Sequence, residues 1–204
     1  MSTEILSYKT LGGPTEAQYR VLGSRHLAYT FPVNSEEQIK EHIDRLWKEH
    51  HNATHVCYAW RLGYEKKRYR INDDGEPGGT AGKPIYGQIQ SFDLTNVLVA
   101  VVRYFGGTKL GTGGLIDAYK TASKLAIEQA SIIEKPVMDH FKIKFGYAEM
   151  PAVMNLLKQI DFEKIETVFD ASCEVEFLIH ASHRNRLEKE LEELKIETEF
   201  LGRM

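Results

Sequence analysis

The feature that most constrains this chain is the concentration of glycine in two short segments. Ten of the sixteen glycines lie between Gly75 and Gly114, most of them in the segments DDGEPGGTAGKP and RYFGGTKLGTGGL. Because glycine loses more backbone entropy than other residues on folding, such clusters indicate positive φ angles or close approach to bare backbone. Between the segments, a short helix is predicted over Ile85–Phe92, and the apolar run Val97–Val102 predicts a strand buried on both faces. The two segments are therefore expected at one edge of a single sheet, facing one site.

The second glycine segment, residues 103–115, lies between that strand and a helix predicted from about Gly113 to Ile132. Backbone N–H groups of such a loop, with the positive end of the helix dipole, favour a phosphate or a carboxylate. A tight connection that binds nothing is the alternative, since the segment has neither a Walker A loop nor a dinucleotide-binding fingerprint. The candidate binding residues are Arg103, Tyr104, Gly106, Gly107, Lys109, Gly111, Gly113 and Gly114.

The first glycine segment, residues 73–84, begins with three carboxylates within four positions, Asp73, Asp74 and Glu76. Hard oxygen ligands in this number could coordinate Mg²⁺. The alternative is a structural turn, because Asp-Asp-Gly side chains also hydrogen-bond nearby backbone amides. We assign no metal and no cofactor, and we add Gly79, Thr80 and Lys83 to the candidate binding residues.

A basic run at residues 66–70 reads Lys-Lys-Arg-Tyr-Arg. Cations that neutralise phosphates and an aromatic ring that stacks on bases suit single-stranded nucleic acid, and a solvated hairpin tip is the alternative. Its candidate binding residues are Lys67, Arg68 and Arg70. The formal net charge is −3, divided as +2 over residues 1–137 and −5 over residues 138–204. Contacts with nucleic acid are therefore expected in the first part of the chain.

The periodicity of apolar residues divides the chain into two domains, 1–136 and 137–204. The second predicts the order βαββαβ, which is typical of a ferredoxin-like sandwich. The first is predicted to be mixed α/β, with a capping box of Ser35 and Gln38 at the start of one helix. The inward face of its last helix is predicted to carry Ile116, Tyr119, Ala122, Ala126 and Ile127. No signal peptide or membrane span is evident, so we expect a cytoplasmic protein without membrane contact.

The two glycine segments together resemble the signature of the YigZ/IMPACT family. The resemblance rests on Asp73–Pro77, Gly79–Pro84, Arg103–Gly107 and Lys109–Leu115. It implies an N-terminal domain with the fold of a ribosomal protein's second domain and, in the bacterial branch, a ferredoxin-like C-terminal domain. The eukaryotic branch is associated with translational control, and the bacterial branch has been proposed to bind nucleic acid. The chain departs from the family pattern at Asp117, where relatives usually have a basic residue.

Two classes of function follow from these observations. The first is a non-catalytic, translation-associated regulator that binds RNA or a ribosomal partner through the glycine segments, Arg103, Lys109 and the basic run. The alternative is an enzyme or sensor for a small phosphorylated metabolite. In it the second glycine segment holds the phosphate, and Asp73, Asp74 or Glu76 holds Mg²⁺ or serves as a base. A surface for docking another protein is a third interpretation. No catalytic residue is assigned, because no motif of nucleophile and base is present, and the oligomeric state stays open.

Overall fold

The computed structural model describes residues 4–169 and 172–204. By its internal contacts the chain divides into two units. The N-terminal unit comprises residues 8–135, and the C-terminal unit comprises residues 136–204 together with the described residues up to Ser7. The sequence analysis assigned those first residues to the N-terminal domain. Both units are mixed α/β, as predicted, and none of the described helices is long and apolar enough to cross a membrane.

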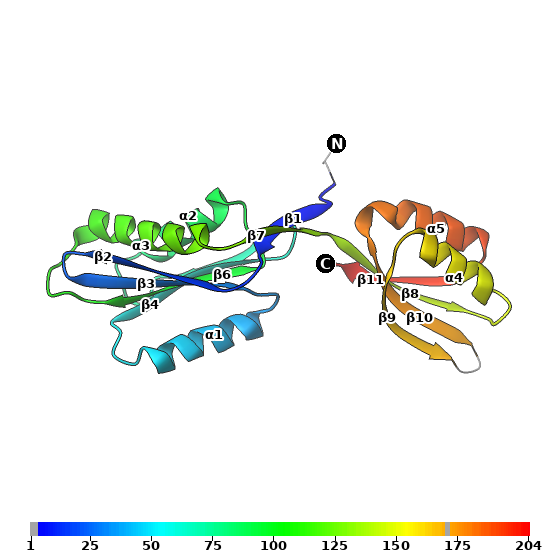
Figure 1. Ribbon diagram of the computed structural model, residues 1–204, viewed down its shortest axis with the longest axis horizontal. Coiled ribbons are helices and arrows are strands. Elements are labelled where there is room, and N and C mark those ends of the chain that lie inside the picture. The colour runs from blue at the N-terminus through cyan, green and yellow to red at the C-terminus, as the bar shows by residue number, and fades with distance from the viewer. Residues whose placement is uncertain (1–3, 170–171) are drawn as a thin grey trace. The chain divides into compact units, whose positions relative to one another are not determined.

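The N-terminal unit is built on a five-stranded sheet with the order β2-β3-β6-β4-β5, in which all neighbours are antiparallel. Its strands are β2 (Thr15–Val21), β3 (Ser24–Pro32), β4 (His55–Leu62), β5 (Arg68–Asn72) and β6 (Val97–Tyr104). Helix α1 (Glu36–Glu49) covers one face, whereas α2 (Gly82–Ser91) and α3 (Gly111–Glu128) cover the other (Figure 1). A separate two-stranded sheet pairs β1 (Ser7–Leu11) with β7 (Ile132–Pro136).

Strand β6 confirms the prediction of a strand buried on both faces. Val97, Val99 and Val101 pack into the core under α2 and α3. The alternate residues Leu98, Ala100 and Val102 pack into the core under α1. Successive side chains of a strand point to opposite faces, so a continuous apolar run is stable only between two cores.

The boundaries of α3 differ from the prediction. The helix ends at Glu128, and Ile132 instead begins β7, where it pairs in a sheet with β1. Four of the five residues predicted to face inward are buried, but Ile116 is 39% exposed. Leu115 takes the inward position in that first turn. The helix therefore ends about one turn earlier than predicted. Periodicity does not show this end or the pairing of β7 with β1, because both depend on tertiary contacts.

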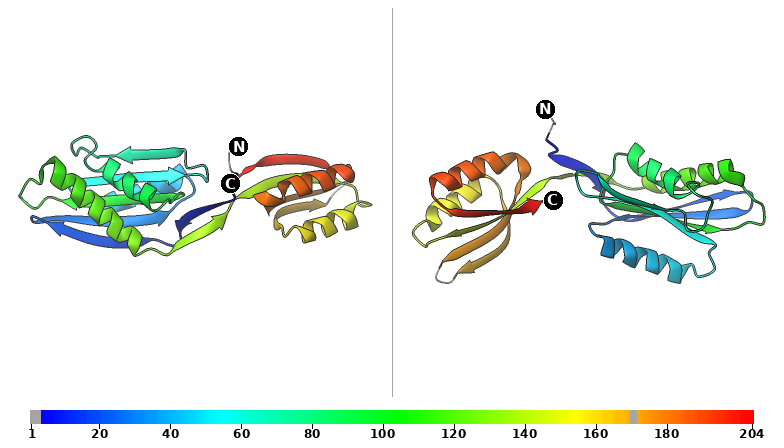
Figure 2. Two further views of the ribbon diagram at one scale, coloured as in Figure 1. Left: turned by 90° about the horizontal axis from the view of Figure 1, so that it is seen from above. Right: turned by 180° about the vertical axis from the view of Figure 1, so that it is seen from behind.

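The C-terminal unit has the predicted order of elements. They are β8 (Met138–Phe145), α4 (Met150–Gln159), β9 (Glu163–Phe169), β10 (Cys173–His180), α5 (Arg184–Glu193) and β11 (Glu197–Arg203), with a short 3₁₀ turn over Ala181–His183. The strands form one antiparallel sheet in the order β11-β8-β10-β9. Both helices lie on the same face of this sheet (Figure 2). Their apolar sides close a core around Phe141, Phe177 and Leu187.

Candidate functional site

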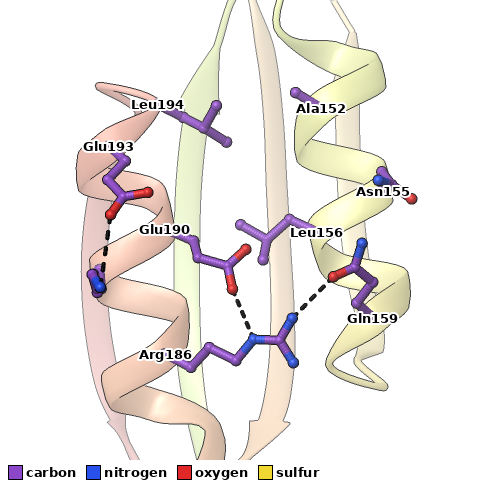
Figure 3. A pocket seen from close by; sticks show the side chains of 9 residues that line it. Ala152, Asn155, Leu156, Gln159, Arg186, Glu190, Glu193 and Leu194 are labelled. Carbon is purple, nitrogen blue, oxygen red and sulfur yellow. Dashed lines mark hydrogen bonds and ion pairs between the residues drawn. The ribbon is translucent and has the colours of Figure 1, made fainter.

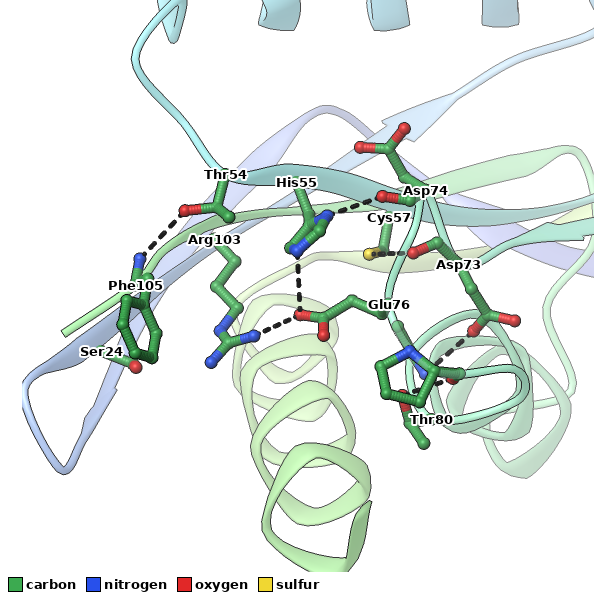
Figure 4. Close-up of polar contacts among 12 residues, drawn as sticks. Ser24, Thr54, His55, Cys57, Asp73, Asp74, Glu76, Thr80, Arg103 and Phe105 are labelled. Atoms are coloured by element: carbon green, nitrogen blue, oxygen red, sulfur yellow. Dashed lines mark hydrogen bonds and ion pairs between the residues drawn. The ribbon is translucent and has the colours of Figure 1, made fainter. Parts of the chain in front are cut away.

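The two glycine segments meet at one edge of the five-stranded sheet. Strands β5 and β6 are each antiparallel to β4, so they run in the same direction and both end at this edge. The first glycine segment follows β5, and the second begins at the end of β6. Glu76 joins them, because its Oε1 accepts a hydrogen bond from Arg103 Nη1 at 2.5 Å (Figure 4). The same oxygen accepts a hydrogen bond from the Tyr119 hydroxyl at 2.7 Å.

The Arg103–Glu76 contact is a buried ion pair. The side chains of Arg103 and Glu76 are only 7% and 3% exposed. The sequence analysis named Arg103 as a candidate binding residue, and in the structure its guanidinium points inward and is neutralised by Glu76 within the fold. The central carbon of that guanidinium, Cζ, lies 5.8 Å from the centre of the Phe105 ring. The ion pair of Arg103 with Glu76 therefore connects the two glycine segments, and the charge of Arg103 does not face solvent.

Arg103 lies in a row with one histidine from each neighbouring strand. His26 of β3 and His55 of β4 are both register partners of Arg103 in β6, so all three point to the same face of the sheet. His55 Nδ1 donates to the carbonyl of Asp74 at 2.6 Å, and its Nε2 lies 3.9 Å from Glu76 Oε1. This hydrogen bond fixes the imidazole orientation against the first glycine segment.

Burial keeps the remaining titratable groups of the cluster neutral. It lowers the pKa of His26 to about 4, and the nearby Arg103 charge acts in the same direction. Burial likewise raises the pKa of the Cys57 thiol and of the Tyr119 hydroxyl well above their ordinary values. Cys57 donates to the Asp73 carbonyl at 3.1 Å and contacts the Tyr119 oxygen at 3.3 Å. At neutral pH neither group is an activated nucleophile.

The carboxylates of the first glycine segment bind the fold itself. Asp73 accepts hydrogen bonds from the amides of Gly79, Ala81 and Gly82 at 2.8–3.0 Å, which satisfies the start of α2. Asp74 accepts from the amide of Val56 at 2.7 Å. Within residues 4–169 and 172–204, no three His, Cys, Asp or Glu side chains are grouped to hold a metal ion. The structural-turn alternative therefore agrees with the observed contacts.

The other candidates in this segment divide between interior and surface. The Thr80 hydroxyl donates to the carbonyl of Pro77 at 2.7 Å and is buried. Lys83 is exposed on the first turn of α2, where its side chain lies against Gly79. The positive charge of Lys83 therefore faces solvent, whereas Thr80 belongs to the interior.

Replacement of Asp73 by alanine is expected to lower the free energy of unfolding by about 1–2 kcal/mol at pH 7, as for loss of a helix cap. Burial opposes ionisation of Asp73, but the hydrogen bonds from Gly79, Gly82 and Ala81 outweigh it and hold the pKa of this carboxyl below its ordinary value. Its stabilisation is therefore complete above the unfolded-state pKa of about 3.9 and is lost as the pH falls through the folded-state pKa.

Thermal unfolding of the wild type and of Asp73→Ala between pH 7 and pH 3 would measure this effect. The difference in Tm should narrow at the acid end. Asp117→Ala is the control, because Asp117 is exposed on α3. A difference that stays constant with pH would contradict the assignment of the ionised carboxylate as the cap.

The second glycine segment is shaped by a close crossing of two backbones. Gly106 lies against the turn between β2 and β3, where an added Cβ would fall 1.9 Å from the carbonyl carbon of Gly23. Gly111, at the start of α3, has a φ of +69°, a conformation that side chains disfavour. The N-cap residue of α3 is Leu110, whose side chain forms no capping hydrogen bond. Lys109 is exposed beside this start.

The basic run lies apart from both glycine segments. It spans the connection from β4 to β5, at the opposite end of these strands from Asn72 and His55. Lys66 contacts Asp93 at 2.5 Å, Lys67 contacts Glu65 at 3.0 Å and Arg68 contacts Glu36 at 2.9 Å. The structure thus does not bring Lys67, Arg68 and Arg70 together with the second glycine segment into one surface.

A hollow of about 560 Å³ lies between α4 and α5 of the C-terminal unit (Figure 3). Its polar groups satisfy one another, since Arg186 contacts both Glu190 and Gln159, and Lys189 contacts Glu193. The run of glutamates in α5 therefore forms ion pairs along the helix.

Several residues of the buried cluster were missed by the sequence analysis. They are His26, His55, Cys57 and, in its polar role, Tyr119. His26 and His55 stand at alternating positions of apolar strands, which is a weak signal on its own. Only the register of β3, β6 and β4 shows that they flank Arg103.

The chain is similar in sequence to known proteins of one family. Residues 22–127 match the family model described as the Impact N-terminal domain. The chain is 31% identical over 188 residues to the IMPACT family member YvyE of Bacillus subtilis (strain 168), covering 92% of this chain and 87% of that protein. It is also 31% identical over 160 residues to the IMPACT family member YigZ of Escherichia coli (strain K12), covering 78% of each.

A solved structure extends the similarity to the fold. It is a crystal structure of a hypothetical protein, 26% identical in sequence, with a TM-score of 0.76 over 96% of this chain and 97% of the other. Both units of the chain are therefore represented in a known structure.

Proposed function

This chain belongs to the IMPACT family, and from that premise we propose that it is a non-catalytic, translation-associated regulator whose N-terminal unit binds RNA. The link to translation comes from the family resemblance. RNA is favoured as the ligand because the N-terminal part of the chain carries the positive charge and has a surface suited to phosphate. A ribosome-associated protein is the second partner that the family resemblance suggests.

The start of α3 carries this proposal. It is the N-terminus of an 18-residue helix whose N-cap residue, Leu110, has an apolar side chain that forms no capping hydrogen bond. Lys109 is exposed beside it, and Gly111 and Gly113 leave the backbone without side chains. Backbone N–H groups at a helix N-terminus favour a phosphate, and a neighbouring cation adds to that preference. We assign the RNA contact to Lys109 and to the backbone of residues 106–114, and no longer to Arg103.

The alternative of an enzyme or sensor for a phosphorylated metabolite is less well supported. It required Asp73, Asp74 or Glu76 to hold Mg²⁺ or to act as a base. Each of these carboxylates is engaged by protein donors. The phosphate-binding part of that alternative is retained, because the start of α3 would bind any phosphate-bearing ligand.

We also propose the finer fold assignments that the family resemblance implies. For the C-terminal unit, a ferredoxin-like sandwich is supported by the order β8-α4-β9-β10-α5-β11 and the sheet order β11-β8-β10-β9. For the N-terminal unit, the fold of a ribosomal protein's second domain remains an assignment by resemblance.

Reversal of the charge at Lys109 tests the proposed RNA contact. We expect the purified protein to retain single-stranded RNA at low salt and to release it as salt rises. Lys109→Glu should weaken binding about tenfold at low salt and reduce the slope of log affinity against log salt by about 1, because one phosphate contact is lost. Fluorescence anisotropy of a labelled oligonucleotide across a salt series measures both quantities.

Lys189→Glu is the matched control for this experiment. It makes the same change of charge at a side chain that is 76% exposed in the C-terminal unit. If Lys189→Glu weakens binding as much as Lys109→Glu, the effect is one of net charge. Absence of RNA binding by the wild type at the lowest salt would reject the proposal.

A further inference from the structure

Two tyrosines of the N-terminal unit are held side by side on the sheet face that also carries α1. Tyr29 of β3 and Tyr104 of β6 both hydrogen-bond to His50, which follows the last turn of α1. The Tyr29 oxygen lies 2.9 Å from Nε2 of His50, and the Tyr104 oxygen lies 3.0 Å from Nδ1. One imidazole thus fixes both rings. We call Tyr29, Tyr104 and His50 the tyrosine platform.

The row of aromatic rings continues from the platform along β3 to Phe31, which is buried. The rings of Tyr29 and Phe31 are parallel to within 3°, with centroids 6.4 Å apart. The imidazole of His42 stacks on Phe31 at 4.1 Å. A hollow of about 330 Å³ opens between these rings and α1, and Glu16, Arg45 and Glu49 also line it. Its volume lies within the range of small-ligand sites.

Two cations stand at the other end of the platform without carboxylate partners. Arg25 and Arg20 are directly opposite each other in the β2–β3 pair. Like charges in this position destabilise a sheet. Within the described part of the chain neither forms an ion pair, and the guanidinium of Arg25 lies 4.4 Å over the ring of Tyr104. A phosphate near these guanidinium groups would remove the repulsion between them.

The platform adjoins the surface that we assign to RNA. Tyr104 is the last residue of β6 and lies at the start of the second glycine segment. Gly106 of that segment packs against Gly23, which lies in the turn between Arg20 and Arg25. Arg20, Arg25 and Lys109 are therefore cations at the same edge of the sheet.

We propose that the tyrosine platform stacks the bases of single-stranded nucleic acid, while Arg20 and Arg25 contact its phosphates. This inference rests on the proposed function and adds to it a second surface, distinct from the start of α3. Aromatic rings and guanidinium planes beside cations are what bound single strands require. Because Tyr29 and Tyr104 are fixed by His50, little side-chain entropy is lost when a base stacks on them.

Paired ligands separate stacking from phosphate binding. The first is a short oligocytidylate, and the second is a strand of the same length and backbone that lacks the bases. The wild type is expected to bind the oligocytidylate more tightly than the strand that lacks the bases. The double variant Tyr29→Leu, Tyr104→Leu should bind it about tenfold to a hundredfold more weakly, while binding of the abasic strand changes less than twofold. Arg25→Gln, which spares both rings, should weaken the binding of both ligands.

Tyr147→Leu is the matched control. Tyr147 is 57% exposed and belongs to the C-terminal unit, to which no RNA contact is assigned. Its replacement should leave the preference for the oligocytidylate unchanged. Photocrosslinking of wild-type protein to an oligonucleotide with a photoreactive base, followed by mass spectrometry, needs no variant and should label β3 or β6.

The outcomes distinguish this inference from the function on which it rests. Equal affinity of the wild type for the two ligands, or crosslinks confined to other elements, would overturn base stacking and leave RNA binding at the start of α3 intact. If neither ligand binds at low salt, the proposed function itself fails. If both ligands bind and the double variant loses both equally, the platform supports the fold and does not read bases.

Discussion

Replacement of Glu76 by leucine is expected to lower the free energy of unfolding of the N-terminal unit by about 3–5 kcal/mol, because it leaves a buried charge without its partner. The Glu76 carboxylate neutralises Arg103 and accepts the hydrogen bond of Tyr119 in the interior. Leucine supplies neither the negative charge that neutralises Arg103 nor an acceptor for the Tyr119 hydroxyl. The loss should also separate the two glycine segments, because Glu76 is the residue that joins them.

Tryptophan fluorescence during urea unfolding measures this change in the relevant unit. Both tryptophans of the chain, Trp47 and Trp60, belong to the N-terminal unit. Glu65→Ala is the control, because the Glu65 side chain is 50% exposed and its ion pair with Lys67 lies at the surface. That replacement should change stability by less than about 1 kcal/mol.

A compensating variant tests whether the unpaired charge is the cause. Glu76→Leu combined with Arg103→Met replaces the buried ion pair by apolar groups, and such replacements are often neutral or stabilising. The double variant should therefore be more stable than Glu76→Leu alone. A double variant that is no more stable would indicate that the hydrogen bond from Tyr119, or the packing of Glu76, is the larger contribution.

Replacement of Gly106 by alanine is the second change with a large expected effect. Its Cβ would lie 1.9 Å from the carbonyl carbon of Gly23 and 2.1 Å from the amide nitrogen of Ser24. These are backbone atoms, so relief requires the turn between β2 and β3 to move. We expect a loss of about 3 kcal/mol, at the upper end of the range for overpacking, together with weaker RNA binding because the second glycine segment is displaced.

Gly113→Ala provides a matched comparison in the same segment. An added Cβ at Gly113 meets nothing within 4 Å, and the residue lies within α3. Alanine is favoured over glycine in a helix, so this variant should be more stable than the wild type by about 0.5–1 kcal/mol. Chemical denaturation of both variants and of the wild type measures these differences in the free energy of unfolding. Equal stability of the two would mean that the backbones at Gly106 and Gly23 separate easily.

The elements that sequence reasoning predicted well are those fixed by local pattern. The apolar run of β6 needs a core on each side, and both cores are present. The capping residue Ser35 accepts from the amide of Gln38 at 3.3 Å, and α1 begins at the next residue. The alternation in the C-terminal unit gave its order of strands and helices. These features depend on residues within a few positions of one another.

The contacts of the candidate binding residues could not be predicted from the sequence, because they depend on partners distant in sequence. Arg103 is indistinguishable from a surface cation until Glu76, in another segment, is placed beside it. The basic run and the second glycine segment were both named as binding elements, and antiparallel pairing of β4 with β5 and with β6 puts them at opposite ends of these strands. Strand direction is a tertiary property that local charge does not encode.

The sequence alone determined the family, the mixed α/β class and the presence of two glycine segments that require bare backbone. The tertiary structure decided which side chains those segments bring together. It buried Glu76 with Arg103, turned the three carboxylates toward protein donors and left Lys109 exposed at the start of α3. The physical reason is that backbone preference acts over a few residues, whereas charge pairing and burial depend on strand order and register.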